Sequence, residues 1–136
     1  MAKKANTQTV QAVRKTITKK ELKEKIISKL ASRGVSEPKS ASAEQLYQAT
    51  VQTVKEILVS DREKFKKRIK SFGVKKVYYL CMEFLVGRSL KNVAINLGIY
   101  AGLSEILTEF GSSFEDIYNC EVEPGLGNGG LGRLAA

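Results

Sequence analysis

The residues with the clearest chemical purpose are the glycines near the end of the sequence. Five of the nine residues from Gly125 to Arg133 are glycine. Glycine has no Cβ and reaches positive φ at little cost, so the backbone N–H groups of such a run can converge on an anion. Residues 131–136 read as the first turn and a half of a helix, whose free N–H groups and positive dipole end would face the same point. The run therefore predicts a cradle for a phosphate or sugar-phosphate group, with a plain glycine-rich turn as the alternative.

The glycine run has the spacing of a dinucleotide-binding loop but not its context. Gly125, Gly127 and Gly130 fit the Gly-x-Gly-x-x-Gly pattern. In that motif an apolar strand leads directly into the first glycine, whereas residues 119–124 are acidic and end in proline. A Gly-Lys-Ser/Thr ending is also missing, which excludes a P-loop. The spacing alone therefore does not assign the ligand.

Within the run, Gly129, Gly130 and Leu131 are the residues best placed to face a ligand. Two consecutive glycines at the start of a helix expose N–H donors to a dianion. Asn128 either holds the loop through an Asx-type hydrogen bond or reaches the ligand itself. Arg133, in the first turn of the predicted helix, offers a positive charge to phosphate or else pins a neighbouring loop.

A further candidate, Glu83, follows a predicted strand. Residues 77–82 form a continuous apolar run rich in β-branched and aromatic side chains, which is typical of a strand buried on both faces. Open α/β sheets place ligand groups at the C-terminal ends of their strands. Glu83 is therefore a candidate for positioning substrate or water, with an ion pair to Arg88 as the structural alternative. The nearby side chains expected in the core are Tyr78, Tyr79, Cys81 and Phe84.

The elements that must position these residues are mainly helices. Thr18 with Glu21, and Ser42 with Gln45, have the spacing of capping boxes. The first predicts a helix of about 15 residues that ends at Arg33. The second predicts a long helix that runs to about residue 70 and is broken at residue 73. Short helices are expected over residues 89–97, 100–110 and 113–118.

The long helix carries one predicted apolar stripe. It is expected to pack against the core of this chain, with a partner subunit as the alternative. Its residues are Tyr47, Val51, Val54, Leu58, Phe65, Ile69 and Phe72.

Length and composition exclude several classes of protein. The 136 residues suffice for one small domain, and histidine, the commonest general base and zinc ligand, is absent. No apolar run approaches the roughly 18 residues of a membrane span, and the first residues lack the apolar segment of a secretory signal. Cys81 and Cys120 are expected to be free thiols in a reducing compartment. The expected location is cytoplasmic, without a membrane partner.

The net charge of +9 is unevenly distributed. Residues 1–76 carry 20 Lys/Arg and 7 Asp/Glu, whereas residues 77–136 carry 3 and 7. A basic first half is compatible with a nucleic-acid-binding module. Residues 1–39, however, contain no aromatic side chain that could stack on a base. We therefore expect solvated helix faces and no nucleic-acid partner.

Two motifs in a fixed order carry a more specific signal. Residues 77–92, and residues 125–136 about 30 positions later, resemble the α-glucan phosphorylases, the family of glycogen, starch and maltodextrin phosphorylases. The resemblance extends from roughly residue 42 to residue 136. It implies an α/β fold: the N-terminal part of a Rossmann-like domain of a two-domain (GT-B type) glycosyltransferase, mostly helical in this stretch and with one clear strand. Residues 1–17 are expected to be a flexible basic arm, and residues 18–136 an incomplete portion of that domain.

The resemblance also implies a reaction. Members of this family split terminal α-1,4-glucosidic bonds with inorganic phosphate and release glucose 1-phosphate. They hold pyridoxal phosphate as a Schiff base, and its phosphate group takes part in proton transfer. The glycine loop borders the catalytic cleft, so the match of motif places Gly129, Gly130 and Leu131 near the sugar and the phosphates, and Glu83 in the lining of the cleft.

The cofactor-binding lysine of the family lies far downstream of these motifs, and none of the lysines here stands in a matching motif. No catalytic residue is therefore expected in this sequence, and the chain is expected to be inactive alone. The implied ligands are an α-glucan and inorganic phosphate or glucose 1-phosphate, and the implied assembly is a homodimer. Activation by AMP is not expected, because residues 69–71 lack the aromatic side chain that animal members use.

Three other functions remain as alternatives. A glycogen or starch synthase shares the architecture, but it places a lysine shortly before the glycine pair, and here that lysine is missing. A basic nucleic-acid-binding module would leave both motifs unexplained. A non-catalytic phosphorylase remnant would act as an interaction module and dimerise through the long helix.

Overall fold

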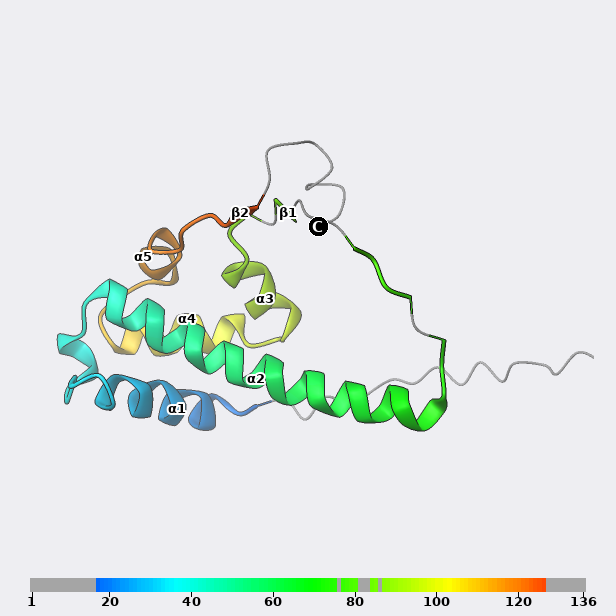
Figure 1. Cartoon of the computed structure of the whole chain (residues 1–136). Helices are drawn as coiled ribbons and strands as arrows, with labels where there is room; N and C mark the ends of the chain where they lie inside the picture. The colour runs from blue at the N-terminus through cyan, green and yellow to red at the C-terminus, as the bar shows by residue number, and fades with distance from the viewer. Residues whose placement is uncertain (1–16, 76, 81–83, 86, 127–136) are drawn as a thin grey trace, which may run out of the picture.

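The computed structural model describes residues 17–75, 77–80, 84–85 and 87–126 (Figure 1). The predicted basic arm, residues 1–17, lies outside the described residues except for Ile17, which packs against the core. The described part is mostly helical, as predicted. Its elements are α1 (Lys19–Ala31), the short 3₁₀ turn η1 (Pro38–Ser40), α2 (Ala43–Phe72), β1 (Phe84–Leu85), α3 (Leu90–Asn96), α4 (Tyr100–Glu109), α5 (Phe114–Asn119) and β2 (Gly125–Leu126).

Helix α1 begins where its capping box predicts. The Oγ1 atom of Thr18 accepts from the N–H of Glu21 at 3.2 Å, and a Glu21 carboxylate oxygen accepts from the N–H of Thr18 at 2.9 Å. The helix ends at Ala31, two residues before the expected position. Gly34, at φ +81°, then reverses the chain so that the N–H of Val35 donates to the carbonyl of Leu30 at 3.1 Å.

Helix α2 is the longest element. Ser42 and Gln45 form the predicted capping box at its start. Gly73 ends it in the left-handed conformation, at φ +59°, where a side chain would be strained. Its 30 residues correspond to about 45 Å of helix. Figure 1 shows that its C-terminal half extends beyond the other helices.

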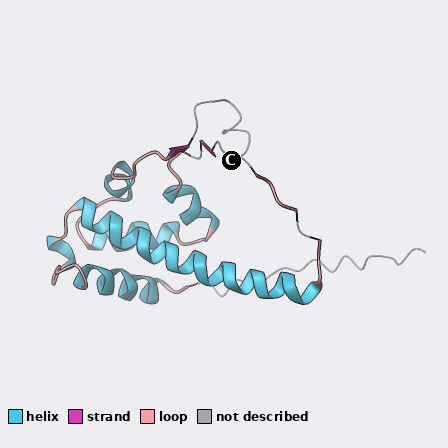
Figure 2. Cartoon of the chain, viewed as in Figure 1, coloured by secondary structure: helices cyan, strands magenta, loops and turns pink. Residues whose placement is uncertain are grey.

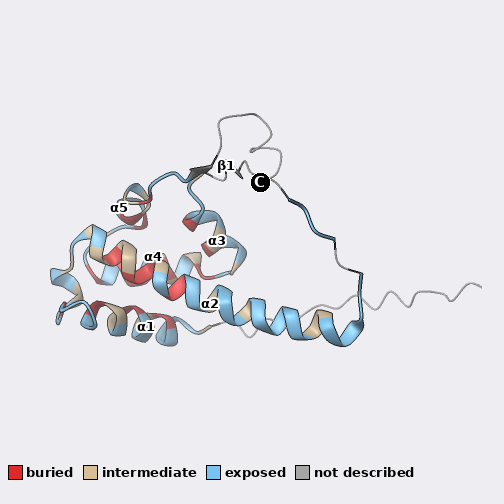
Figure 3. Cartoon of the chain, viewed as in Figure 1, coloured by how far each residue is buried: buried red, intermediate tan, exposed pale blue. Residues whose placement is uncertain are grey.

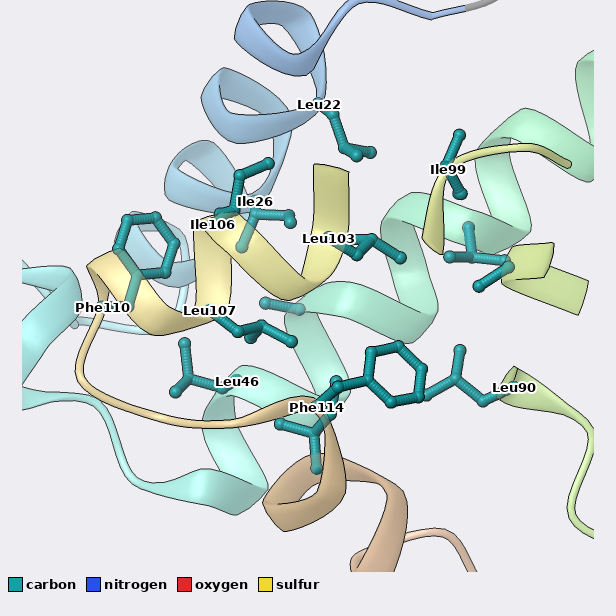
Figure 4. Packing of buried hydrophobic residues seen from close by; sticks show 14 of the residues in the cluster. Leu22, Ile26, Leu46, Leu90, Ile99, Leu103, Ile106, Leu107, Phe110 and Phe114 are labelled. Carbon is teal, nitrogen blue, oxygen red and sulfur yellow. The ribbon is translucent and has the colours of Figure 1, made fainter. Parts of the chain in front are cut away.

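The core lies where α1, the N-terminal half of α2, α4 and α5 meet (Figures 3 and 4). Each helix contributes aliphatic or aromatic side chains at helical spacing, and the rings of Tyr100 and Phe114 meet edge to face at 4.8 Å. The largest fully buried apolar side chains are Leu22, Ile26, Leu30, Leu46, Leu103, Ile106, Leu107 and Ile117. A cluster of this kind stabilises the fold by removing apolar surface from water.

The apolar stripe predicted for α2 packs against the core only in its first part. Val54 is buried, and Tyr47 and Val51 are partly buried against the core. The most deeply buried side of the helix is formed by Leu46, Ala49, Thr50, Thr53 and Val54. The prediction was wrong for the C-terminal half, where the stripe residues are exposed, up to 63% at Phe72, apart from the partly buried Ile69. The reason is that α1 and α5 pack against α2 beside the stripe, and only along its N-terminal half (Figure 3).

The predicted buried strand was also wrong. Residues 77–80 have no regular secondary structure, and their side chains are between 70% and 93% exposed. Tyr78 and Tyr79 are therefore not core residues, whereas Cys81 lies outside the described residues. A strand requires neighbours that take up its N–H and C=O groups and cover its faces. An apolar run signals that a segment can be buried, but it does not provide the neighbouring strands.

The observed sheet is a short pairing of β1 with β2. The pairing is antiparallel, with Phe84 opposite Leu126 and Leu85 opposite Gly125 (Figure 2). These strands have two residues each. The described part of the chain is therefore α-helical with one two-residue ladder, rather than helical with one clear strand.

Candidate functional site

The six residues that the sequence assigns to the ligand lie outside the described residues. They are Glu83, Asn128, Gly129, Gly130, Leu131 and Arg133. The structure instead describes the neighbouring segments of the chain, which are residues 84–85 after Glu83 and residues 121–126 before the remaining glycines.

The β1–β2 pairing brings the two sequence motifs together. Phe84 comes directly after Glu83 in the chain, and its partner Leu126 directly precedes the remaining glycines. About 40 residues separate the two strands, so no local pattern relates them. The pairing therefore joins one motif to the other at the positions where the candidate ligand residues begin.

A carboxylate from the segment just before the second motif reaches the start of α3, which lies in the first motif. The carboxylate oxygens of Glu121 accept from the N–H of Ser89 at 2.7 Å and from the N–H of Leu90 at 3.1 and 3.2 Å. Ser89 itself provides no side-chain cap to α3. Glu121 therefore satisfies the N–H groups of Ser89 and Leu90 at the start of this helix and places a negative charge at the positive end of its dipole.

The loop after β1 is shaped by a glycine. Gly87 has φ +70°, and a Cβ at this position would lie 3.7 Å from a carboxylate oxygen of Glu123. Glycine is required here because of its backbone conformation rather than because of crowding.

Arg88 ties the start of α3 to the end of α5. Its guanidinium lies 5.2 Å from the centre of the Tyr118 ring, and its Nη1 donates to the side-chain oxygen of Asn119 at 3.4 Å. Lys91 lies 6.0 Å from the same ring. The proposed ion pair between Arg88 and Glu83 involves a residue outside the described part, so these contacts with α5 are the ones that the structure assigns to Arg88.

A groove of about 360 Å³ lies between α2, α3 and residues 121–124. Its apolar lining includes Val51, Leu58 and Val93, which places the predicted stripe of α2 along this groove. Burial, and then the nearby charges of Glu121 and Glu44, raise the pKa of the Tyr47 phenol at its edge. Tyr47 is therefore a neutral hydrogen-bonding group, and the groove suits an apolar occupant better than a dianion.

Other chemistry is limited in the described part of the chain. Cys120 is a free thiol whose Sγ lies 3.4 Å from the carbonyl oxygen of Asp116. Burial, followed by the charge of Glu44, raises its pKa, so it is a poor nucleophile at neutral pH.

Among the described residues no cluster of His, Cys, Asp and Glu could hold a metal ion. None of the described helices is long and apolar enough to span a membrane.

Glu121 is the residue that sequence reasoning missed. A signal was present, because Ser89 starts a short helix without the Glu or Gln three positions later that completes a capping box. Helices α1 and α2 have such a local pair, and α5 has Ser113 with Asp116 in its place. Without one, the N–H groups at the start of α3 are open to an acceptor from elsewhere in the fold, and the acidic segment before the glycine run provides it.

No family model matches the chain. Among curated proteins, it is 40% identical to the glycogen phosphorylase of Pasteurella multocida (strain Pm70) over 123 residues, which is 90% of this chain and 15% of that protein. It is 39% identical over 99 residues, or 73% of this chain and 10% of the relative, to the chloroplastic/amyloplastic alpha-1,4 glucan phosphorylase L-2 isozyme of Solanum tuberosum. A maltodextrin phosphorylase of Streptococcus pneumoniae serotype 4 is 52% identical over 64 residues, which is 47% of this chain and 8% of that protein. The chain thus spans about 15% of the length of the first of these relatives.

Proposed function

We propose that this chain, which belongs to the α-glucan phosphorylase family, forms one wall of a cleft that binds an α-glucan and phosphate. The whole reaction would be phosphorolysis of terminal α-1,4-glucosidic bonds. The bond between C1 of the terminal glucose and the glucosidic oxygen breaks, a phosphate oxygen bonds to C1 to give glucose 1-phosphate, and the shortened glucan leaves with a proton on its freed oxygen. The observation that carries the proposal is the β1–β2 pairing, because it brings the chain beside Glu83 to the start of the glycine run.

The proposed roles follow from the chemistry of a bound phosphate. The N–H groups of Gly129, Gly130 and Leu131 would donate to the phosphate or to the sugar hydroxyls, and Arg133 would balance the charge of the dianion. Hydrogen bonds to a charged group contribute about 1.5–3 kcal/mol each, so three or four donors suffice for measurable binding. Asn128 would hold the loop or reach the ligand, and Glu83 would orient the substrate or water.

The exposed apolar surface supports a place within a larger Rossmann-like domain of the GT-B type. Residues 77–80 and the C-terminal half of α2 expose large aromatic and aliphatic side chains. Exposed large apolar side chains in such numbers are typical of faces that pack against other protein elements. In the proposed enzyme, further strands would pair with residues 77–80 and cover this side of α2.

The described lysines do not fit the Schiff base of pyridoxal phosphate. A Schiff-base lysine is kept neutral by an apolar pocket or a neighbouring cation, whereas every described lysine is exposed or partly exposed. The hydrogen bonds from Lys19 to Glu105 and Glu109 raise the pKa of Lys19, which keeps it charged. No step of the reaction is therefore assigned to a lysine of the described part of the chain.

A second candidate, a non-catalytic interaction module, is supported by α2. Leu58, Phe65 and Phe72 lie along one face of its C-terminal half and are exposed. Such a face can pair with a second copy of the same helix. This function and the phosphate site make different predictions, because only the latter requires the glycine run.

The phosphate site can be tested by NMR on the ¹⁵N-labelled chain. Titration with inorganic phosphate, and separately with glucose 1-phosphate, is expected to shift the amide signals of Gly129 and Gly130, since these N–H groups would donate to the ligand. Sodium chloride at equal ionic strength controls for screening of the basic surface. Unchanged glycine amides at saturating phosphate would rule out this site.

A further inference from the structure

Glu121 joins two parts of the fold that are distant in sequence. It is only 8% exposed and lies two positions after Asn119, the last residue of α5. Its carboxylate accepts from the N–H groups of Ser89 and Leu90, at distances from 2.7 to 3.2 Å. Hydrogen bonds from backbone N–H groups to a carboxylate are among the strong ones in proteins because one partner is charged. These hydrogen bonds therefore hold Glu121 firmly at the start of α3.

The start of α3 depends on this link. Ser89 has helical backbone angles, φ −114° and ψ −18°, and its side chain caps no N–H group of the helix. At the starts of α1, α2 and α5, the N–H groups are capped by side chains at most three positions away. Among the helices that the structure describes, α3 is the one that takes a capping carboxylate from about 30 residues further along the chain.

The same link lies close to the β1–β2 pairing. Three residues separate Glu121 from Gly125, and three separate Leu85 from Ser89. Leu85 and Gly125 face each other across the ladder. The two segments are therefore joined at both ends, at one end by the ladder and at the other by the carboxylate. We call these two connections, Leu85 with Gly125 and Glu121 with Ser89 and Leu90, the double link.

A two-residue ladder is too short to hold two segments by itself. The carboxylate is anchored to α3, and Leu90 and Ala94 of this helix are buried in the core. The double link thus fixes the ladder to the rigid helical part of the molecule. If the carboxylate were removed, the ladder would lose its nearest fixed point.

We propose that Glu121 is a positioning residue of the phosphate site: through its hydrogen bonds to the start of α3, it holds the start of the glycine run beside β1. This inference rests on the proposed function, because the phosphate site is itself a proposal. In this proposal Glu121 acts through the ladder rather than by contact with the ligand, because Gly125 precedes the donor glycines in the chain.

Hydrogen–deuterium exchange of the whole chain, followed by mass spectrometry, tests the link without any ligand. In Glu121→Ala we expect faster exchange in peptides that cover residues 84–90 and 121–126, while peptides from α1 and α4 stay protected. Glu121→Asp keeps the charge but is one carbon shorter, so an intermediate increase is expected. Glu24→Ala, which removes an exposed carboxylate from α1, is the matched control and should leave all these peptides unchanged.

Calorimetric titration with inorganic phosphate tests the functional part. Glu121→Ala is expected to weaken phosphate binding about tenfold. This is the lower end of the loss in metal affinity that follows when a residue hydrogen-bonded to a metal ligand is replaced. Glu24→Ala should bind as the parent chain does. Unchanged exchange at the ladder together with unchanged phosphate affinity in Glu121→Ala would overturn the inference.

The remaining outcomes are also decisive. If Glu121→Ala loses the helical core altogether, the shorter Glu121→Asp decides, and an unchanged ladder in that variant contradicts a positioning role. If the parent chain binds no phosphate, the proposed site fails, but the exchange of residues 84–90 and 121–126 still decides whether Glu121 holds the ladder.

Discussion

Leu85 lies opposite Gly125 in an antiparallel pair, although 40 positions separate them. This contact places the middle of one family motif against the beginning of the other. Because the remaining glycines follow Leu126 directly, the pairing determines where the candidate phosphate cradle starts. The first prediction concerns this cradle.

Arg133→Ala is expected to weaken binding of inorganic phosphate about tenfold, because a charge-assisted hydrogen bond contributes roughly 1.5–3 kcal/mol. Calorimetric titration measures the affinity. Arg62→Ala removes the same charge from the exposed surface of α2 and is the matched control. Equal weakening in both variants would mean that phosphate responds only to the net charge of the chain.

The helical core should respond strongly to a cavity. Leu103→Ala removes a fully buried side chain from α4 and should lower the free energy of unfolding by about 2–5 kcal/mol. Ile95→Ala, on the exposed face of α3, should change it by no more than about 0.5 kcal/mol. Urea unfolding followed by circular dichroism at the helical band measures both. Similar losses in the two variants would contradict the observed packing.

The stability of the helical core should fall in acid. Hydrogen bonds from Lys23 and Lys19 hold the pKa of Glu109 below its ordinary value of 4.5. The side chain and N–H of Ser113 do the same for Asp116, whose ordinary value is 3.8. A carboxyl group whose pKa is lower in the folded state contributes stability that is complete above its unfolded pKa and is lost as the pH falls through the folded value.

The midpoint of urea unfolding is therefore expected to stay constant from neutral pH down to about pH 5 and to decrease below it. Glu109→Gln removes one of the responsible groups, so its profile should be flatter than that of the parent chain. The control is Glu24→Gln, which changes an exposed carboxyl of α1. A midpoint that rises on acidification would contradict the assignment.

The exposed face of α2 should promote self-association. The double variant Phe65→Ser, Phe72→Ser removes two exposed aromatic side chains and is expected to shift the chain toward the monomer in sedimentation velocity. Ile95→Ser lowers exposed apolar area on α3 and is the control. If both variants sediment as the parent chain does, this face does not mediate association of the chain.

The chain alone is expected to release no glucose 1-phosphate from glycogen and inorganic phosphate. The physical reason is that no described lysine is buried in the way a Schiff base requires. A coupled assay that detects glucose 1-phosphate measures this, with added pyridoxal phosphate to exclude simple loss of the cofactor. Detectable turnover by the purified chain would contradict the expectation.

Much of the helical structure could be predicted from the sequence because its signals are local. The capping boxes of Thr18 and Ser42 determine where α1 and α2 begin, since each side chain bonds to a backbone group three residues away. Gly73 ends α2 because it adopts a conformation that other residues avoid. Recognition of the family likewise rested on residue types in fixed order, and the relatives confirm it.

Tertiary structure alone decided which surfaces are covered. The face of α2 with Leu46 and Ala49 is the most deeply buried one, whereas Tyr47 is partly buried and Leu58 is exposed, because α1 and α5 pack on that side. Residues 77–80 are exposed because the described chain provides no neighbouring strand. Glu121 caps α3 because α5 delivers it there from about 30 residues away. Burial and long-range hydrogen bonds depend on which segments pack together in space, and a local pattern of residue types does not specify those contacts.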